Sequence, residues 1–351
     1  MRSRRSLMAG GAALAAVVLL SACSQQAAQS SGEDEGDKAL VVACGAQEDW
    51  CQAVTAAFEE KTGIDTNYVR LSSGEAVARF EASKDNPEFD VWHGGPADGY
   101  SAAKDAGLLE PYVSENTEKI PERFRDTDGY WTGVYIGVLG FCSNQKVLDS
   151  IGADVPESWE DLLDPAFKSQ IGTAHPGTSG TAYTTLWTQV ELSGSEDGGL
   201  DYMRKLHPNV LQYSKSGSAP GQQAGRGEIA TGIIFTHDCV KYIDEGMTDL
   251  VVSVPEEGTG YEIGGVGALA NAHHPSAAKQ YIDFATSIEA QEIGATVGSY
   301  QIPTNAGAKV SEKSIRVEDI VLVNYDAIIA GAAKSALVAR FDSEIATAPT
   351  E

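Results

Sequence analysis

Positively charged residues are scarce in this 351-residue chain. It contains 25 Lys and Arg against 50 Asp and Glu, which gives a formal net charge of −25 at pH 7. We therefore expect no nucleic-acid partner, because binding to nucleic acid needs Lys and Arg to neutralise the phosphates. Any site for an anion must be built locally, from particular side chains and backbone groups, rather than from bulk charge.

The chain also lacks the short motifs of common hydrolases and zinc sites. It has no G-x-S-x-G elbow, no H-E-x-x-H and no C-x-x-C. The stretch "GTGYEIG" at 258–264 has one residue too many for G-x-G-x-x-G. We expect neither an enzyme nor a cofactor nor a bound structural metal. The alternative is a hydrolase that uses His237 and Asp238 beside a serine-rich loop.

A membrane-spanning length of apolar residues is missing from the N-terminus. The apolar run Met8–Leu20 has 13 residues, which is too short to span a bilayer by itself. Its basic start and the small residues after it predict a secretory signal peptide at 1–22, with Sec and Tat export both open. "LSAC" at 20–23 resembles a bacterial lipobox, which implies a lipid on Cys23 that holds the protein to the extracytoplasmic face of the cell membrane. The polar segment 23–38 predicts a flexible tether.

Cysteine is also rare, with five residues in the whole chain. Once Cys23 is assigned to lipid, four remain in an oxidising compartment, and three pairings are possible. Cys44 and Cys51 are close in sequence and could close one strand-to-helix turn. Cys142 and Cys239 would then pair and tie two distant strands together. Four buried thiols are the alternative.

What the chain does contain is a regular alternation of short apolar runs and helical patterns. "ALVVAC" at 39–44 predicts a buried strand, and "CQAVTAAFEEKTG" at 51–63 predicts a helix that ends at a glycine. This alternation continues and is typical of an α/β fold, with a parallel sheet flanked by helices.

Two long β segments, near 135–142 and 262–270, bracket the middle of the chain. We expect them to be two hinge crossings between two α/β lobes. Lobe 1 would comprise 39–137 plus 266–351, and lobe 2 would comprise 138–265. A ligand would bind in the cleft between the lobes, which closes by a hinge motion.

Motifs spread over most of the mature chain resemble the periplasmic-type solute-binding proteins of ABC importers. They include "FDVWHGGPADGY" at 89–100, "GTAHPGTSGTAYTTLWTQ" at 172–189, "KSGSAP" at 215–220, "RGEIATGIIFTHD" at 226–238 and "PEEGTGYEIGGVGAL" at 255–269. The resemblance is to the type II periplasmic-binding-protein fold, in its iron(III), thiamine or sugar-phosphate branch. It implies a monomeric binding protein that captures a small ligand and delivers it to the transmembrane subunits of an ABC permease.

Within that branch, the pair His237–Asp238 indicates the ligand. Ferric-ion binders carry two adjacent tyrosines here, whose phenolates suit Fe(III), whereas this chain has no adjacent tyrosine pair. Hexose-phosphate binders are similar to this chain, with a His-Asp pair and, about two dozen residues on, a Glu that would be Glu262. Such groups can hydrogen-bond sugar hydroxyls. A ferric ion or other metal and an organophosphonate are the alternatives, as are a helix-capping role for Asp238 and a hinge salt bridge for Glu262.

The phosphate of such a ligand needs hydrogen-bond donors. The "HPGTSGT" loop offers hydroxyls and backbone N–H groups where it enters a helix, and "KSGSAP" offers the same chemistry. Trp92 could stack on a sugar face. Helix capping by the hydroxyls and core packing of the indole are the alternatives. The full set of predicted ligand residues is Ser73, Trp92, His93, Thr178, Ser179, Gly180, Thr181, Ser216, Ser218, His237, Asp238 and Glu262.

Overall fold

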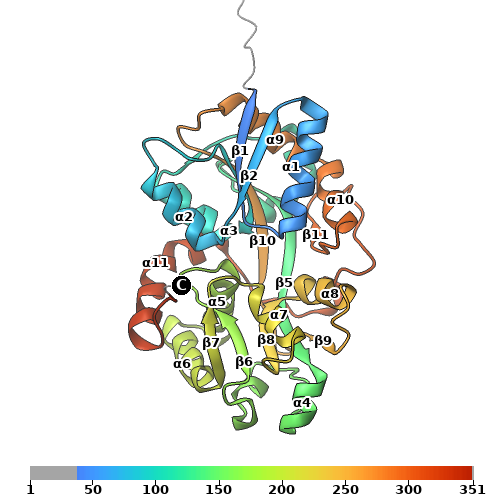
Figure 1. Ribbon diagram of the computed structural model, residues 1–351. Coiled ribbons are helices and arrows are strands. Elements are labelled where there is room, and N and C mark those ends of the chain that lie inside the picture. The colour runs from blue at the N-terminus through green and yellow to red at the C-terminus, as the bar shows by residue number, and fades with distance from the viewer. Residues whose placement is uncertain (1–37, 350–351) are drawn as a thin grey trace, which may run out of the picture. The chain divides into compact units, whose positions relative to one another are not determined.

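The computed structural model describes residues 38–349 (Figure 1). The predicted signal peptide, the lipid-bearing Cys23 and all but the last residue of the predicted tether lie outside this range. The described chain has the predicted mixed α/β fold, with helices packed around one large sheet. In this part of the chain, none of the helices combines the length and the apolarity that crossing a membrane requires.

The first part of the sheet has the strand order β2-β1-β3-β10-β5. Strand β1 pairs in parallel with β2 and β3, and β10 runs antiparallel to both β3 and β5. The strands here are β1 (Ala39–Cys44), β2 (Asp65–Arg70), β3 (Val91–Pro96), β4 (Leu109–Glu110), β5 (Thr132–Asn144), β10 (Tyr261–Leu269) and β11 (Ile302–Pro303). We call this part and its helices lobe 1.

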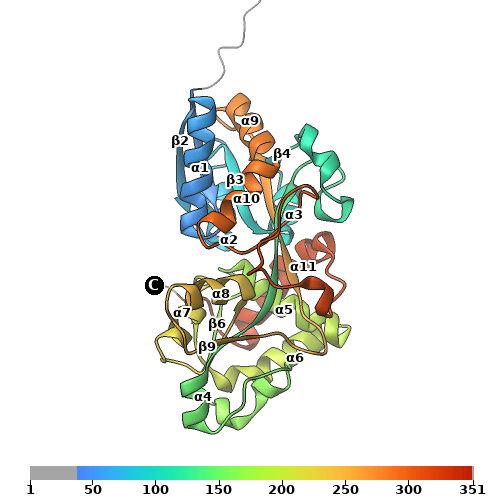
Figure 2. The same ribbon diagram turned by 90° about the vertical axis from the view of Figure 1, so that its right-hand side faces the viewer.

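Both faces of the sheet in lobe 1 are covered by helices, and apolar side chains of the strands pack against the helices on each face. Leu40 and Val42 join the core beneath α1, whereas Trp92 joins the core beneath α2 and α3. Figure 2 shows α9 and α10 beside α1. The predicted glycine cap of α1 is confirmed, since Gly63 has a φ of 73° and donates to Glu59 O at 2.8 Å. The helices are α1 (Glu48–Thr62), α2 (Ser73–Ala82), α3 (Ala97–Asp105), α9 (Pro275–Ala285) and α10 (Ile288–Thr296).

The second part of the sheet, which we call lobe 2 with its helices, has the order β5-β8-β6-β7. Ile233 and Phe235 point into the core under α5 and α6, whereas Ile234 packs with residues of α7 and α8. Its other strands are β6 (Ile171–Ala174), β7 (Val210–Ser214), β8 (Thr231–Phe235) and β9 (Leu250–Ser253). Its helices are α4 (Gln145–Ile151), α5 (Gly180–Ser193), α6 (Glu196–Leu206), α7 (Ala219–Gly225) and α8 (Thr236–Asp244).

Strand β5 connects the two parts of the sheet. Residues 132–138 pair with β10, and residues 139–144 pair with β8 and β9. In Figure 1, β5 and β10 both run between the two groups of helices. Short 3-10 helices complete the chain at Glu115–Lys119, Glu122–Phe124, Asp161–Leu163, Pro165–Phe167, His207–Asn209 and Val317–Asp319.

The last helix, α11 (Ala327–Glu344), contacts both lobes. Lys334 Nζ lies 2.6 Å from the buried carboxylate of Asp98 in α3. On the other side, the Tyr183 hydroxyl of α5 donates to the Ala330 carbonyl at 2.6 Å. The predicted limits of the lobes fall inside β5 and β10 and assign α11 to lobe 1 alone. That division stays a prediction.

Candidate functional site

Loops of both lobes meet around one cavity. In lobe 1 its wall comes from the loops after β1, β2 and β3, and in lobe 2 from the loops after β6, β7 and β8, as is usual at the carboxyl ends of parallel strands. The lining residues are Gly45, Ala46, Gln47, Arg70, Ser72, Ser73, Gly95, Pro96, Tyr135, Ser179, Gly180, Thr181, Ser216, Gly217, Ser218, Phe235, His237, Asp238, Glu262 and Gln301.

His237, Asp238 and Glu262, which were predicted from the sequence, all line this cavity. All three side chains are buried. The His237 Nε2 atom lies 3.9 Å from Asp238 Oδ1, which is too long for a hydrogen bond, and His237 Nδ1 is buried without a partner among the described residues. His237 and Glu262 both lie against Gly137, where a Cβ atom would come within 2.7 Å of His237 Cε1 and 2.8 Å of Glu262 Oε1. Glycine in the hinge strand therefore makes room for this pair.

Burial sets the protonation states of these groups. It raises the pKa of Glu262 well above its usual range, and the negative charges of Asp238 and Asp98 raise it further. Burial also lowers the pKa of His237, which the nearby charge of Asp238 partly offsets. The cavity therefore favours a protonated carboxyl at 262 and a neutral imidazole at 237. Both can donate and accept hydrogen bonds with a hydroxyl-bearing ligand.

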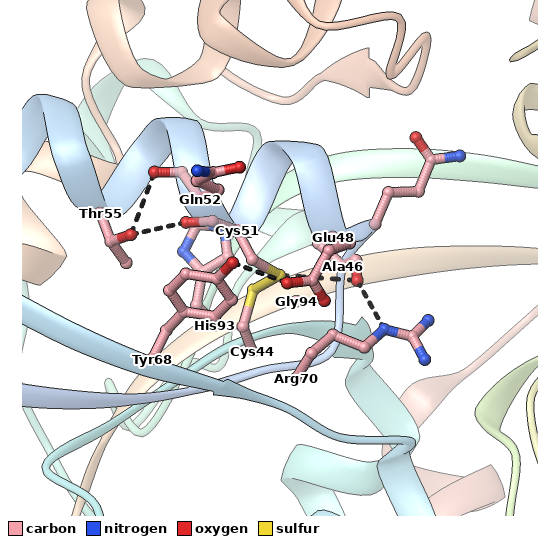
Figure 3. Close-up of a disulfide and its surroundings, with 12 residues drawn as sticks. Cys44, Ala46, Glu48, Cys51, Gln52, Thr55, Tyr68, Arg70, His93 and Gly94 are labelled. Carbon is pink, nitrogen blue, oxygen red and sulfur yellow. Dashed lines mark hydrogen bonds between the residues drawn. A yellow bond between two sulfur atoms is a disulfide. The ribbon is translucent and has the colours of Figure 1, made fainter.

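Gln47 reaches this group from the opposite lobe. Its Nε2 donates to Asp238 Oδ1, and its Oε1 accepts from Ser299 Oγ at 2.6 Å. The turn that carries Gln47 is closed by the Cys44–Cys51 disulfide, as Figure 3 shows. The side chain is thus presented from a short, cross-linked turn between β1 and α1.

The second disulfide joins Cys142 of β5 to Cys239, which directly follows Asp238 in the first turn of α8. Both predicted pairings are therefore confirmed. Each covalent bond lies beside a residue that lines the cavity, one in each lobe. The cross-lobe hydrogen bond from Gln47 to Asp238 consequently joins two cross-linked turns.

The cavity is also lined by small hydroxyl groups, several of them near the start of α5. Ser179 caps this helix, its Oγ accepting from Ala182 N at 3.4 Å. Ser216 Oγ lies 3.2 Å from Ser218 Oγ on the loop after β7. Ser73 comes from lobe 1, and a Cβ at Gly180 would lie 2.8 Å from its Oγ. The predicted serines and Thr181 thus all line the cavity, and the N-terminus of the 14-residue helix α5 favours an anion there.

Three of the predicted ligand residues do not line the cavity. The Trp92 indole is fully buried in the core, stacked on Tyr100 with ring centroids 3.9 Å apart. His93 is also buried, with Nδ1 3.2 Å from the Tyr281 hydroxyl, and burial lowers the pKa of His93 to about 4. The Thr178 hydroxyl is within 3.2 Å of two backbone carbonyls, and the Thr178 carbonyl accepts from Gly74 N of lobe 1 at 3.0 Å.

The reason for the first two placements is the length of β3. This strand continues through Pro96, so Gly95 and Pro96 rather than Trp92 and His93 reach the cavity. Thr178 sits one residue before the helix cap, at a point where the loop hydrogen-bonds its own neighbours and lobe 1. A role for these three residues in contacting ligand has no support in this geometry.

Arg70 lines the cavity and was missed from the sequence. It is the last residue of β2, and Figure 3 shows its guanidinium beside the cross-linked turn, where Nε donates to the Ala46 carbonyl at 3.3 Å. No other Lys or Arg lines this cavity among the described residues. The available signal was its position immediately before "LSSGE", at the carboxyl end of a predicted strand.

An ion pair connects the two lobes beside the cavity. Lys241 Nζ of α8 lies 2.6 Å from Asp49 of α1, and it also lies 2.8 Å from Glu245, which directly follows α8. A second, wider cavity opens here and shares Gln47, Arg70 and Asp238 with the first, among other residues. The two lobes are therefore in contact through Gln47 and Asp238, through Asp49 and Lys241, and through Gly74 and Thr178.

A family model described as "Bacterial extracellular solute-binding protein" matches residues 95–328. The chain belongs to this family. A relative from Haemophilus influenzae, an uncharacterised protein, is 40% identical over 323 residues, which are 90% of this chain and 93% of the relative. As predicted, this chain is therefore a solute-binding protein of the kind that serves ABC importers rather than an enzyme.

Two solved structures and one further relative are similar to this chain to different degrees. The periplasmic binding protein AfuA from Actinobacillus pleuropneumoniae, solved with fructose 6-phosphate, has 39% identity and a TM-score of 0.85, covering 89% of this chain and 99% of its own. A putative 2-aminoethylphosphonate-binding periplasmic protein from Salmonella typhimurium is 29% identical over 51% of each chain. The ferric binding protein from Campylobacter jejuni, at 20% identity and a TM-score of 0.72 over 87% of this chain and 98% of its own, shows a shared fold alone.

Proposed function

We propose that this protein captures a small phosphorylated anion, with a hexose phosphate favoured, and delivers it to the transmembrane subunits of an ABC permease. The two lobes close over the ligand, and a lipid on Cys23 holds the monomer to the extracytoplasmic face of the cell membrane. The ligand is released to the permease when the lobes open.

The observation that carries this proposal is that one cavity is lined by two chemically different groups of residues. The first group consists of hydroxyl side chains and the N-terminus of α5, which suit an oxyanion. The second group consists of His237, Asp238 and Glu262, which suit vicinal hydroxyls. A ligand that satisfies both groups carries an anionic group and hydroxyl groups on one small skeleton.

Arg70 adds a fixed positive charge to the cavity wall. A guanidinium pairs with phosphate through two parallel hydrogen bonds, and its strength in that role does not depend on pH near neutrality. The resemblance to AfuA, whose solved structure contains fructose 6-phosphate, supports the same class of ligand. The Salmonella relative supports a phosphonate as the second candidate.

The first test is native mass spectrometry of the purified mature protein without its lipid, followed by calorimetric titration. The probes are fructose 6-phosphate, glucose 6-phosphate, unphosphorylated fructose, inorganic phosphate, 2-aminoethylphosphonate and ferric citrate. We expect a hexose phosphate to bind far more tightly than either fructose or phosphate alone. Preference for the phosphonate would select the second candidate, and a bound iron mass would replace the proposal with metal capture.

The variant Arg70→Gln tests whether this positive charge contributes to anion binding. We expect an increase in Kd of roughly 10- to 100-fold, the loss associated with one charged hydrogen-bonding group. Arg316→Gln is the matched control, because Arg316 is exposed and remote from the lining residues. Equal affinities for both variants and the wild type would remove Arg70 from the ligand site.

A further inference from the structure

His175 occupies an unusual position at the base of the serine-rich loop. Its side chain is fully buried, yet it does not line the cavity. Its backbone N donates to Ser214 O at 2.9 Å, and its backbone O accepts from the amides of Thr178 and Ser179 at 3.0 and 2.9 Å. The backbone of His175 therefore connects the start of the loop to the end of β7 and to the two residues that precede α5.

The imidazole is held at both nitrogens. Nδ1 lies 3.1 Å from Gly177 N, which can only donate, so Nδ1 is the acceptor and the proton is on Nε2. Nε2 lies 2.9 Å from the Ala346 carbonyl, which can only accept, and 3.1 Å from Asp342 Oδ1. Each ring nitrogen thus faces a group of matching polarity.

The second anchor is the C-terminal segment of the chain. Ala346 follows α11, and the Phe341 ring of α11 packs edge-on against the imidazole with centroids 5.1 Å apart. The Tyr213 ring contacts the imidazole from β7 in the same manner. The ring is thereby fixed against two elements that are independent of the loop.

We propose that His175 is a positioning residue for ligand binding, which fixes the anion-binding loop by connecting the amide of Gly177 to the C-terminal segment. This rests on the proposed function, in which the hydroxyl and amide groups at the start of α5 hold the phosphate. Ser179 and Thr181, which line the cavity, lie within four residues of the fixed Gly177 amide, so their positions depend on it in this proposal. No ligand contact by His175 itself is required.

Two substitutions separate the two bonds. In His175→Asn the side-chain oxygen can accept from the amide two residues on, as asparagine does in common turns, but the bond to Ala346 is lost. In His175→Gln the longer amide can donate to Ala346, but the acceptor for Gly177 N is lost. Both variants lose ring packing, so both are expected to lower the unfolding temperature.

The expected result is that the loop bond, rather than stability, governs affinity. His175→Asn should bind fructose 6-phosphate within about threefold of wild type, whereas His175→Gln should bind about fivefold or more weakly, since one hydrogen bond is involved. In the ligand-free proteins, hydrogen exchange of the 177–182 amides should accelerate in His175→Gln and stay near wild type in His175→Asn. Equal effects of both variants on affinity and exchange would reduce His175 to a core residue.

The exchange measurement also separates this proposal from the proposed function. If the wild type binds none of the phosphorylated probes, the function fails while the exchange comparison still decides what fixes the loop. If the wild type binds fructose 6-phosphate but the loop exchanges equally in all three proteins, the function stands and the positioning role of His175 is refuted.

Discussion

Replacement of Glu262 by Gln should make the stability of the ligand-free protein less dependent on pH. Burial raises the pKa of this carboxyl well above its usual range, and two nearby carboxylates raise it further. Between the ordinary pKa of an unfolded Glu and the raised value, the folded protein binds more protons at this position than the unfolded chain. The free energy of unfolding therefore falls as pH rises through this window.

The slope sets the size of the effect. One proton bound in the folded state alone changes the free energy of unfolding by at most about 1.4 kcal/mol per pH unit. Glu262→Gln has a similar shape and cannot ionise, so its advantage over the wild type should grow by up to that amount per pH unit above pH ~4.5. The growth should stop once the wild-type carboxyl ionises in the folded state.

The assay is urea unfolding of ligand-free protein at pH 5, 6, 7 and 8, followed by circular dichroism. Glu318→Gln, at an exposed position, is the matched control and should shift the wild-type profile by a constant at most. A constant difference between Glu262→Gln and the wild type over this range would refute the reasoning. It would mean that Glu262 is ionised throughout, with its charge stabilised by some group other than those described.

Two further predictions concern the links around the cavity. Removing the Cys142–Cys239 disulfide by a double Ser substitution should destabilise the protein more than removing Cys44–Cys51, because the sequence separations are 97 and 7. The loss of chain entropy in the unfolded state gives upper values of about 4.7 and 2.5 kcal/mol for the decrease in the free energy of unfolding. Urea unfolding measures both decreases, and the reverse order would contradict this reasoning. Lys241→Met removes a partly exposed cross-cleft ion pair, so ligand release in stopped flow should accelerate by less than about fivefold, and the difference should vanish in 0.5 M salt. A persistent difference at high salt would assign another role to Lys241.

Strand patterns predicted much of this fold because buried strands carry their signal locally. The apolar run at 39–44 predicted β1, and the four cysteines left after Cys23 allowed both disulfides to be anticipated. The pair at 237–238 follows a strand, at the edge where a parallel sheet gathers its loops. These features depend on neighbours in sequence and on one general property of the fold.

The errors arose where the exact end of a strand decides which side chains reach the cavity. Trp92 was expected to stack on a sugar in the cleft. Strand β3 continues four residues beyond it, and the indole packs on Tyr100 instead. Arg70 was missed because a position at the end of a strand does not by itself distinguish a side chain that faces solvent from one that turns into a cleft. His175 was missed as well, since its partner Ala346 is 171 residues away.

In the proposed function, helix α8 links ligand binding to lobe closure. Its first turn carries Asp238, which lines the cavity, and Cys239, which is bonded to Cys142 of β5. Lys241 of the same helix pairs with Asp49 of lobe 1. Asp238 already accepts from Gln47, but a carboxylate has two oxygens and several acceptor positions, so a ligand hydroxyl can bind without displacing that contact. A ligand that contacts Asp238 is then bound by the same helix that carries contacts between the closed lobes. It stabilises the closed state by the difference between its affinities for the closed and the open state. We therefore expect substitution of Lys241, which does not line the first cavity, to change the rate of ligand release without removing a contact to the ligand. Substitution of a residue that lines this cavity would instead change the contacts to the ligand directly.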